Sequence, residues 1–312
     1  MSLAFLYPGQ GSQQVGMGIE LLREPYLEHY FAQAQAVSGL PIRRYSLEGP
    51  MIELTRTEVA QPALFAVSLA LTDAARARGL SPALVAGHSL GEYTAAVVAG
   101  AISIEDGMEL VCLRGRLMAE VQAEHPGAMV AVIGLSEQEL EPLCQAASGD
   151  GSIALANINA PGQIVVSGEQ PAVAKLGELA EQAGAERVVS IAAGAAFHGE
   201  LMQSVQAQMS GAMSGVDWND PLVPVAVNAH GRIVRSGEEL REALAAEIAS
   251  PVRWVECVRS LVDAGCDEFL ELGPGRVLAG LVRQIDPGTD VFSADSPARL
   301  DSFVQQRSLA PR

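Results

Sequence analysis

The sequence predicts an α/β protein, with a three-layer domain built on a mostly parallel sheet and a smaller domain inserted into it. Apolar runs of strand length alternate with longer segments whose apolar residues recur at helical spacing, which is typical of a parallel sheet covered on both faces. In the middle of the chain this alternation changes to another order of elements. Apolar residues make up 49% of the 312 residues, enough for a sizeable core in about two domains.

The elements of the larger domain follow one another along the chain. Leu3–Tyr7 is a short apolar run that ends at Pro8-Gly9, and it predicts a buried strand. A second buried strand at 84–86 leads into a glycine turn, and a third at Glu268–Leu272 leads into Gly273-Pro274-Gly275. Apolar residues at helical spacing predict helices at 62–78, 93–99, 106–121 and 277–284.

The middle of the chain predicts a domain of its own. Its expected elements are a strand at 129–135, a helix opened by the capping box of Ser136 and Glu139, strands at 153–157 and 163–167, a helix at 171–183 and a strand at 187–192. The order β-α-β-β-α-β is typical of a ferredoxin-like unit. We therefore expect a ferredoxin-like domain at 126–193, inserted into a large domain of residues 1–125 and 194–296. The tail at 297–312 has no periodicity and is expected to be poorly ordered.

Charge and cysteine usage exclude several classes of protein. Acidic residues number 37 and basic residues 20, for a net charge of −17, which argues against nucleic-acid binding. No segment reaches the roughly 18 uninterrupted apolar residues of a membrane span, and the N-terminus lacks the basic region of a signal peptide. The four cysteines form no CxxC pair, which disfavours a metal site and disulfides. We expect a soluble, reduced, cytoplasmic protein.

The motif Gly87-His88-Ser89-Leu90-Gly91 is the sharpest local signal for chemistry. It lies between a predicted buried strand and a predicted helix, which is the context of a G-x-S-x-G nucleophile elbow. Ser89 would then lie exposed at a helix N-terminus, where backbone N–H groups favour negative charge. The alternative is a glycine turn whose serine merely caps the helix. The strand and helix on either side favour a nucleophile.

A serine nucleophile needs a base, and the chain has five histidines. His88 adjoins Ser89 in the turn and would point elsewhere. His29 is expected in a polar helix, and His125 and His230 in loops. His198 lies among small residues, in Ala195-Ala196-Phe197-His198-Gly199, which leaves room for a ligand. It is the favoured base, and the alternative is a histidine that is hydrogen-bonded in a loop.

Two further features suggest binding roles. Pro8-Gly9-Gln10-Gly11-Ser12-Gln13 follows the first strand, and it could be a phosphate loop, an oxyanion loop or an ordinary turn. A loop at the carboxyl end of a strand in an open sheet favours binding. Arg114 has apolar neighbours one helical turn away on both sides, so its guanidinium is expected to be buried and to need an anion. That anion is either an internal carboxylate or a ligand.

These residues together resemble the malonyl-CoA:acyl carrier protein transacylases, which serve fatty-acid synthesis and, as free-standing acyltransferases, polyketide synthases. The matching motifs run through most of the chain: the loop from Pro8 to Gln13, Gln61-Pro62-Ala63, Gly87-His88-Ser89-Leu90-Gly91-Glu92-Tyr93, Leu113-Arg114-Gly115, Gly127-Ala128-Met129, Asn159-Ala160-Pro161-Gly162-Gln163, Ala196-Phe197-His198, Ser250-Pro251-Val252-Arg253-Trp254 and Glu271-Leu272-Gly273-Pro274-Gly275. The resemblance implies a hydrolase-like α/β domain with an inserted ferredoxin-like domain.

The resemblance also implies a role for each site residue. Ser89 would attack the thioester of malonyl-CoA, and His198 would act as its base. The backbone N–H groups of Gln10 and Leu90 would form the oxyanion hole, and Arg114 would bind the malonyl carboxylate. Backbone carbonyls near residues 250–254 would hold the histidine.

The same resemblance implies the partners. The recipient would be the phosphopantetheine thiol of an acyl carrier protein, with no cofactor, because the coenzyme A thioester is itself a substrate. We expect a monomer. Carrier proteins are usually acidic, so docking needs a local basic patch, for which Lys175, Arg187, Arg276 and Arg283 are the candidates.

Several residues near the expected site bear on acyl-group choice. Phe197 and Leu90 fit the malonyl-type pattern, and Asn159 is a further expected neighbour. Gly199 stands where many relatives have Ser or Cys, and Glu247 stands where the family usually has Gln. An acid at 247 could alter the charge preference for the substrate or raise the pKa of His198. The alternative functions are an acyl hydrolase, a transferase of another acyl group acting on carrier-protein thioesters, and a non-catalytic docking subunit.

Overall fold

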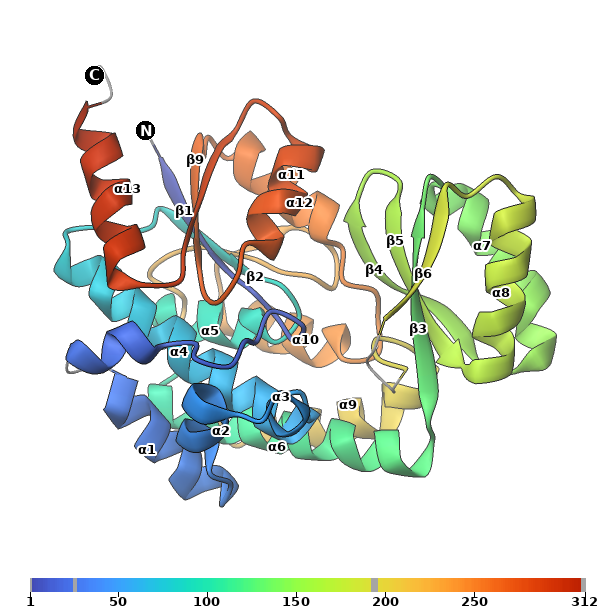
Figure 1. Cartoon of the computed structure of the whole chain (residues 1–312), viewed down its shortest axis with the longest axis horizontal. Coiled ribbons are helices and arrows are strands. Elements are labelled where there is room, and N and C mark those ends of the chain that lie inside the picture. The colour runs from blue at the N-terminus through green and yellow to red at the C-terminus, as the bar shows by residue number, and fades with distance from the viewer. Residues whose placement is uncertain (1, 25–26, 192–195, 310–312) are drawn as a thin grey trace.

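Two sheets organise the molecule (Figure 1), which we describe from a computed structural model covering residues 2–24, 27–191 and 196–309. The larger sheet has six strands in the order β10-β9-β1-β2-β7-β8. Neighbouring strands are parallel except for the short pair β7 and β8, which is antiparallel. The strands are β1 (Leu3–Tyr7), β2 (Leu84–Gly87), β7 (Val225–Ala226), β8 (Ile233–Val234), β9 (Glu268–Leu272) and β10 (Asp290–Ala294).

The larger sheet is the middle of three layers, because its strands alternate their side chains between two apolar cores. In β1, Phe5 and Tyr7 pack into one core and Ala4 and Leu6 into the other. Helices α11 (Trp254–Asp263) and α12 (Val277–Ile285) cover the face of Ala4 and Leu6. The opposite face is covered by a larger group of helices: α1 (Leu27–Ser38), α4 (Thr57–Ala77), α5 (Gly91–Val98), α6 (Ile104–Glu124), α9 (Gln203–Met213) and α10 (Gly237–Glu247).

The second sheet lies beside the first and is wholly antiparallel, in the order β4-β5-β3-β6. Helices α7 and α8 pack on one of its faces, as Figure 1 shows. The predicted capping box of Ser136 and Glu139 is present at the start of α7. The elements, in chain order, are β3 (Gly127–Ile133), α7 (Glu137–Ala147), β4 (Ile153–Ala160), β5 (Gln163–Glu169), α8 (Gln170–Gln182) and β6 (Arg187–Ile191). This is the predicted order of elements. The predicted strand end at 192 and the predicted domain boundary at 193/194 lie outside the described residues.

The expectation of a poorly ordered tail is wrong over most of its length. Residues Pro297–Leu309 form a helix, α13, whose Leu300 and Phe303 are buried. Arg307 of α13 forms an ion pair with Glu268 at the start of β9, at 2.8 Å. Leu300 and Phe303 are the only side chains described as buried on this helix, so its apolar pattern is too sparse to stand out in the sequence. Residues 310–312 lie outside the described part of the chain.

Some elements were not predicted because they are short or lack a regular apolar pattern: the helices α2 (Ile42–Glu48) and α3 (Met51–Leu54), the two-residue strands β7 and β8, and the edge strand β10. No bounds were predicted for the longer helices α1, α9, α10 and α11. Within the described residues, no helix is both long and apolar enough to cross a membrane.

Candidate active site

Ser89 lies at the carboxyl end of β2, in the sharp turn that leads into α5. Its φ is 51°, and Ser89 and His198 are the only non-glycine residues with positive φ in the described part of the chain. The turn is tight because β2 and α5 meet at two glycines. A Cβ on Gly87 would lie 1.9 Å from the Gly91 carbonyl carbon, and a Cβ on Gly91 would lie 2.1 Å from the backbone oxygen of Tyr7. Both positions therefore accept only glycine. The predicted nucleophile elbow is therefore present, with its serine in a strained conformation.

Asn228 holds this turn, and sequence reasoning missed it. The Ser89 N–H donates to Asn228 Oδ1 at 2.7 Å, and Asn228 Nδ2 donates to the Gly87 oxygen at 2.8 Å. Asn228 follows β7, which pairs in parallel with β2, so the carboxyl ends of the two strands lie side by side. A polar residue directly after the apolar run Val225-Ala226-Val227 was the signal that could have found it.

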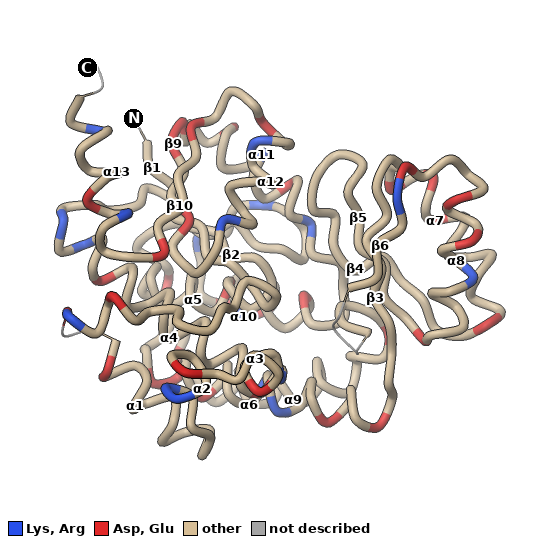
Figure 2. The backbone as a smooth tube through the Cα atoms, viewed as in Figure 1, with Lys and Arg blue, Asp and Glu red and all other residues tan. Residues whose placement is uncertain are grey.

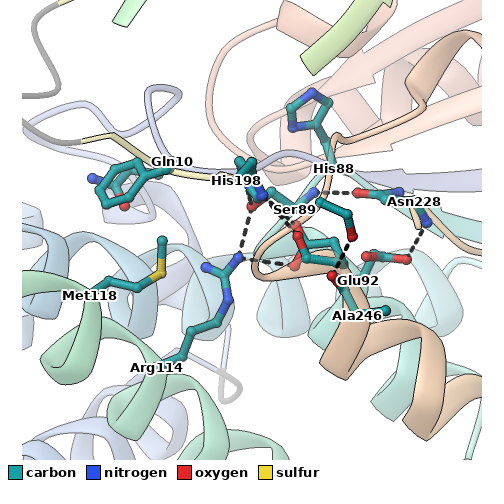
Figure 3. A network of polar contacts seen from close by, with 12 residues as sticks. Gln10, His88, Ser89, Glu92, Arg114, Met118, His198, Asn228 and Ala246 are labelled. Atoms are coloured by element: carbon teal, nitrogen blue, oxygen red, sulfur yellow. Dashed lines mark hydrogen bonds and ion pairs between the residues drawn. The ribbon is translucent and has the colours of Figure 1, made fainter. Parts of the chain in front are cut away.

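His198 is placed as a general base for Ser89. Its Nε2 lies 3.0 Å from Ser89 Oγ, and its Nδ1 lies 3.1 Å from the backbone oxygen of Glu247 (Figure 3). A carbonyl only accepts, so Nδ1 carries a hydrogen and Nε2 is left free to take the serine proton. The resemblance implied a backbone carbonyl near residues 250–254, and the carbonyl is that of Glu247, at the end of α10.

Burial sets the pKa of His198. The side chain is only 4% exposed, and its desolvation lowers the pKa below the ordinary value. The Glu247 carboxylate acts in the opposite direction, as the sequence argument expected, but the burial effect is larger and the pKa falls overall. The imidazole is therefore neutral near pH 7, which is the form that can accept a proton.

Arg114 pairs with an internal carboxylate, one of the two anions expected from the sequence, and it also contacts the Ser89 hydroxyl. Its side chain is 1% exposed on α6. Nη2 donates to Glu247 Oε2 at 3.2 Å and to Ser89 Oγ at 2.9 Å, and Figure 3 shows the guanidinium pointing at the serine. The internal partner is thus Glu247, which lies 133 residues further along the chain.

Gln10 and Leu90 border the serine from two loops at the same edge of the sheet, because β1 and β2 are parallel neighbours. Within the described residues, neither backbone N–H donates a hydrogen bond. Both groups are therefore available to an oxyanion. The Gln10 side chain is held away by Thr57, to which its Nε2 donates at 3.1 Å.

The catalytic groups open into a pocket of about 280 Å³ between the two sheets. Ser89, Arg114 and His198 line it with the loop after β1, and Met118, Met129 and Phe197 add apolar surface. Asn159 also lines the pocket, and its Oδ1 accepts a hydrogen bond from His88 Nε2 at 2.8 Å. His88 therefore points away from Ser89, as expected. Burial lowers the pKa of His88 to about 4, so it stays neutral.

The four basic candidates for carrier-protein docking are divided between two groups of elements, α8 and β6 of the smaller sheet and α12 beside the larger one. Arg276 is exposed and precedes Val277, which lines the pocket. Lys175 lies on α8 and pairs with Glu178 at 3.6 Å. Arg187 and Arg283 lie on β6 and α12, where Arg283 donates to the Val291 oxygen. Figure 2 shows acidic residues along α7 and α8, at the end of the molecule away from the larger sheet.

The sequence pattern of the acyl transferase domain matches residues 4–293 of this chain. A malonyl CoA-acyl carrier protein transacylase of Bacillus subtilis is 36% identical over 305 residues, covering 97% of this chain and 96% of the relative. The chain belongs to the malonyl-CoA:acyl carrier protein transacylase family.

Solved structures of the family share this fold over nearly the whole chain. The transacylase of Xanthomonas oryzae pv. oryzae superposes with a TM-score of 0.93 at 38% identity, covering 98% of this chain and 99% of that one. A malonyl-transacylase in complex with its type II polyketide synthase acyl-carrier protein gives a TM-score of 0.94 at 36% identity, covering 98% and 100%.

The carboxyl group of Glu92, which lies in the transacylase motif that contains Ser89, has a role that the sequence did not predict. Glu92 is fully buried on α5, and its Oε1 accepts the backbone N–H of Asn228 at 2.7 Å. The same asparagine holds Ser89, so Glu92 helps to fix the elbow through Asn228. The pKa of Glu92 is raised well above its ordinary value, first by burial and then by the charge of Glu247, which keeps it neutral.

Proposed function

We propose that this chain transfers a malonyl group from malonyl-CoA, through an ester on Ser89, to the phosphopantetheine thiol of an acyl carrier protein. The observation that carries the proposal is the convergence of Ser89, His198 and Arg114 on one pocket. A nucleophile, its base and a desolvated cation are what a thioester with a free carboxylate requires. Family membership supports the same reaction.

The first half-reaction uses groups already in contact. His198 Nε2 takes the Ser89 proton as Oγ attacks the thioester carbon, and the N–H groups of Gln10 and Leu90 stabilise the oxyanion. Collapse of the tetrahedral intermediate breaks the carbon–sulfur bond, and the proton on His198 passes to the departing coenzyme A sulfur. The product is a malonyl ester on Ser89.

The second half-reaction reverses these roles. His198 takes the proton of the phosphopantetheine thiol, and the sulfur attacks the ester carbonyl. Ser89 leaves as an alkoxide and recovers its proton from His198. Both steps exchange one acyl bond for another without oxidation or reduction, so the proposed reaction uses no cofactor or metal.

The proposal extends to the domains and their setting. Residues 126–193 would form the ferredoxin-like domain that closes one side of the pocket, and residues 1–125 with 194–296 the hydrolase-like domain that carries the nucleophile. Phe197 and Asn159 would bound the acyl chamber, since both line the pocket. We propose that the enzyme acts as a cytoplasmic monomer.

The main competing function is hydrolysis of acyl groups from carrier proteins. The two are separated by mixing the enzyme with malonyl-CoA and a carrier protein that bears phosphopantetheine. We expect malonyl-carrier protein to account for most of the coenzyme A released, with little free malonate. If free malonate instead accounts for the coenzyme A and the carrier protein stays unloaded, the chain is a hydrolase.

Carrier-protein docking gives a separate prediction. Arg276 is exposed and precedes Val277, which lines the active-site pocket and is itself 51% exposed, so reversing the charge of Arg276 should weaken the encounter with an acidic carrier. Arg276→Glu should lower kcat/KM for the carrier protein about tenfold at low salt, while self-acylation by malonyl-CoA stays unchanged. Lys175→Glu, on α8, is the matched control and should leave both rates unchanged. Equal effects of the two variants would place docking elsewhere.

A further inference from the structure

The ion pair between Arg114 and Glu247 poses a charge problem for the substrate. Both side chains are buried, at 1% and 0% exposure, and their closest atoms are 3.2 Å apart. Arg114 is also the cation offered to the malonyl carboxylate in the proposed function, on which this inference rests. The malonyl carboxylate would therefore bind to a guanidinium that is already paired with the carboxylate of Glu247.

The other titratable groups around Glu247 bring no charge to offset a second anion. These groups are Glu92 and Tyr93 on α5, His88 in the turn before α5, and His198 in the loop after β6. Desolvation by burial keeps all four neutral near pH 7, because it raises the pKa of the acids and lowers the pKa of the imidazoles. The free site thus holds one cation and one anion, with a net charge of zero.

Adding a malonyl carboxylate to this site would leave two buried anions beside one buried cation. An unpaired buried charge is strongly unfavourable, and Glu247 has no exposed surface through which water could solvate it. Glu247 Oε1 already lacks a hydrogen-bond partner within the described residues, although it lies 3.4 Å from His198 Nδ1. Neutral Glu247 would restore the net charge of zero.

We propose that this enzyme takes up one proton from solvent when it binds a malonyl group, that Glu247 accepts the proton, and that an uncharged acyl group binds without proton uptake. Arg114 then exchanges an ion pair with Glu247 for an ion pair with the substrate carboxylate. Glu247 is thereby a specificity-determining residue, because it makes preference for malonyl over uncharged acyl groups depend on pH.

Isothermal titration calorimetry counts the protons directly. Malonyl-CoA is titrated into Ser89→Ala, which binds without being acylated, in buffers of different ionisation enthalpy at one pH. The slope of the observed enthalpy against the buffer's ionisation enthalpy should correspond to uptake of about one proton. Acetyl-CoA should give a slope near zero, which removes any contribution from the coenzyme A moiety. Malonyl-CoA binding without proton uptake would overturn the proposal.

Two variants identify the acceptor. Glu247→Gln has the same size and cannot ionise, so combined with Ser89→Ala it should abolish the uptake. Glu268→Gln is the matched control, because Glu268 is also a buried acid paired with an arginine, Arg307. This pair lies outside the pocket, with Glu268 on β9 and Arg307 on α13. That control should keep the full uptake. Unchanged uptake in Glu247→Gln would show that the proton goes to another group, and would contradict the proposal.

A kinetic test can be made first on the unaltered enzyme, where the folding of a variant plays no part. In the unaltered enzyme, the ratio of kcat/KM for malonyl-CoA to that for acetyl-CoA should fall as the pH rises, by about tenfold per pH unit where one full proton is taken up. In Glu247→Gln the ratio should be flat. A flat ratio in the unaltered enzyme would refute the linkage. A malonyl ester that still forms on Ser89 would leave the proposed function intact, so the two failures are distinguishable.

Discussion

Replacing His198 with alanine should slow acylation of Ser89 by malonyl-CoA by about 10²–10⁴, the usual contribution of a positioned general base. Within the described residues, the Ser89 hydroxyl has two side-chain partners, His198 and Arg114. The guanidinium of Arg114 can only donate a hydrogen bond, so His198 is the partner that can accept the serine proton. The rate is measured as the burst of coenzyme A released when enzyme and malonyl-CoA are mixed rapidly.

The matched control for this variant is His125→Ala. His125 is exposed at the end of α6, outside the pocket, and its loss should leave the burst unchanged. A burst of normal rate in His198→Ala would remove His198 from the mechanism. A collapse of both variants would point to lost folding rather than lost chemistry.

Removing the Arg114 guanidinium should cost malonyl-CoA at least about tenfold in kcat/KM, because hydrogen bonds to charged groups contribute about 1.5–3 kcal/mol. The ion pair with Glu247 changes how this must be tested. Arg114→Ala alone would leave Glu247 as an unpaired buried charge, which destabilises the fold by about 3–5 kcal/mol. The informative comparison is therefore between Glu247→Gln and the double variant Arg114→Ala/Glu247→Gln.

Neither variant of that pair leaves Glu247 as an unpaired charge, so their comparison reports the loss of the guanidinium, and the acetyl substrate accounts for the lost hydrogen bond to Ser89 Oγ. Malonyl-CoA should lose the expected tenfold or more, whereas kcat/KM for acetyl-CoA should hold or rise, because acetyl has no carboxylate to lose. Arg114→Lys/Glu247→Gln should recover part of the malonyl activity, since a point charge lacks the planar fork of arginine. Equal losses for both substrates would make Arg114 a structural residue.

The parts of the fold that depend on local pattern could be predicted from the sequence. The strands Leu3–Tyr7 and Glu268–Leu272 have the predicted bounds, and the capping box at Ser136 opens α7. The helix after Ser296 could not be recognised, because packing on neighbouring elements stabilises it and its own apolar periodicity is weak.

The site divides in the same way. Ser89 stands in a local motif, and the elbow predicted from it is present. Arg114 was expected to be buried from its helical neighbours alone, but its contact with Glu247 joins two helices 133 residues apart and leaves no local trace. Asn228 was missed for the same reason, because its role depends on the pairing of β7 with β2.

The central claim, a malonyl ester on Ser89, is tested most directly by intact-protein mass spectrometry after brief incubation with malonyl-CoA. The unaltered protein should gain the mass of one malonyl group, and peptide mapping should locate it on Ser89. Ser89→Ala should gain none, and addition of carrier protein with free phosphopantetheine should discharge the ester from the unaltered enzyme. A malonyl adduct that persists in Ser89→Ala, or an unaltered protein that gains no mass, would contradict the account.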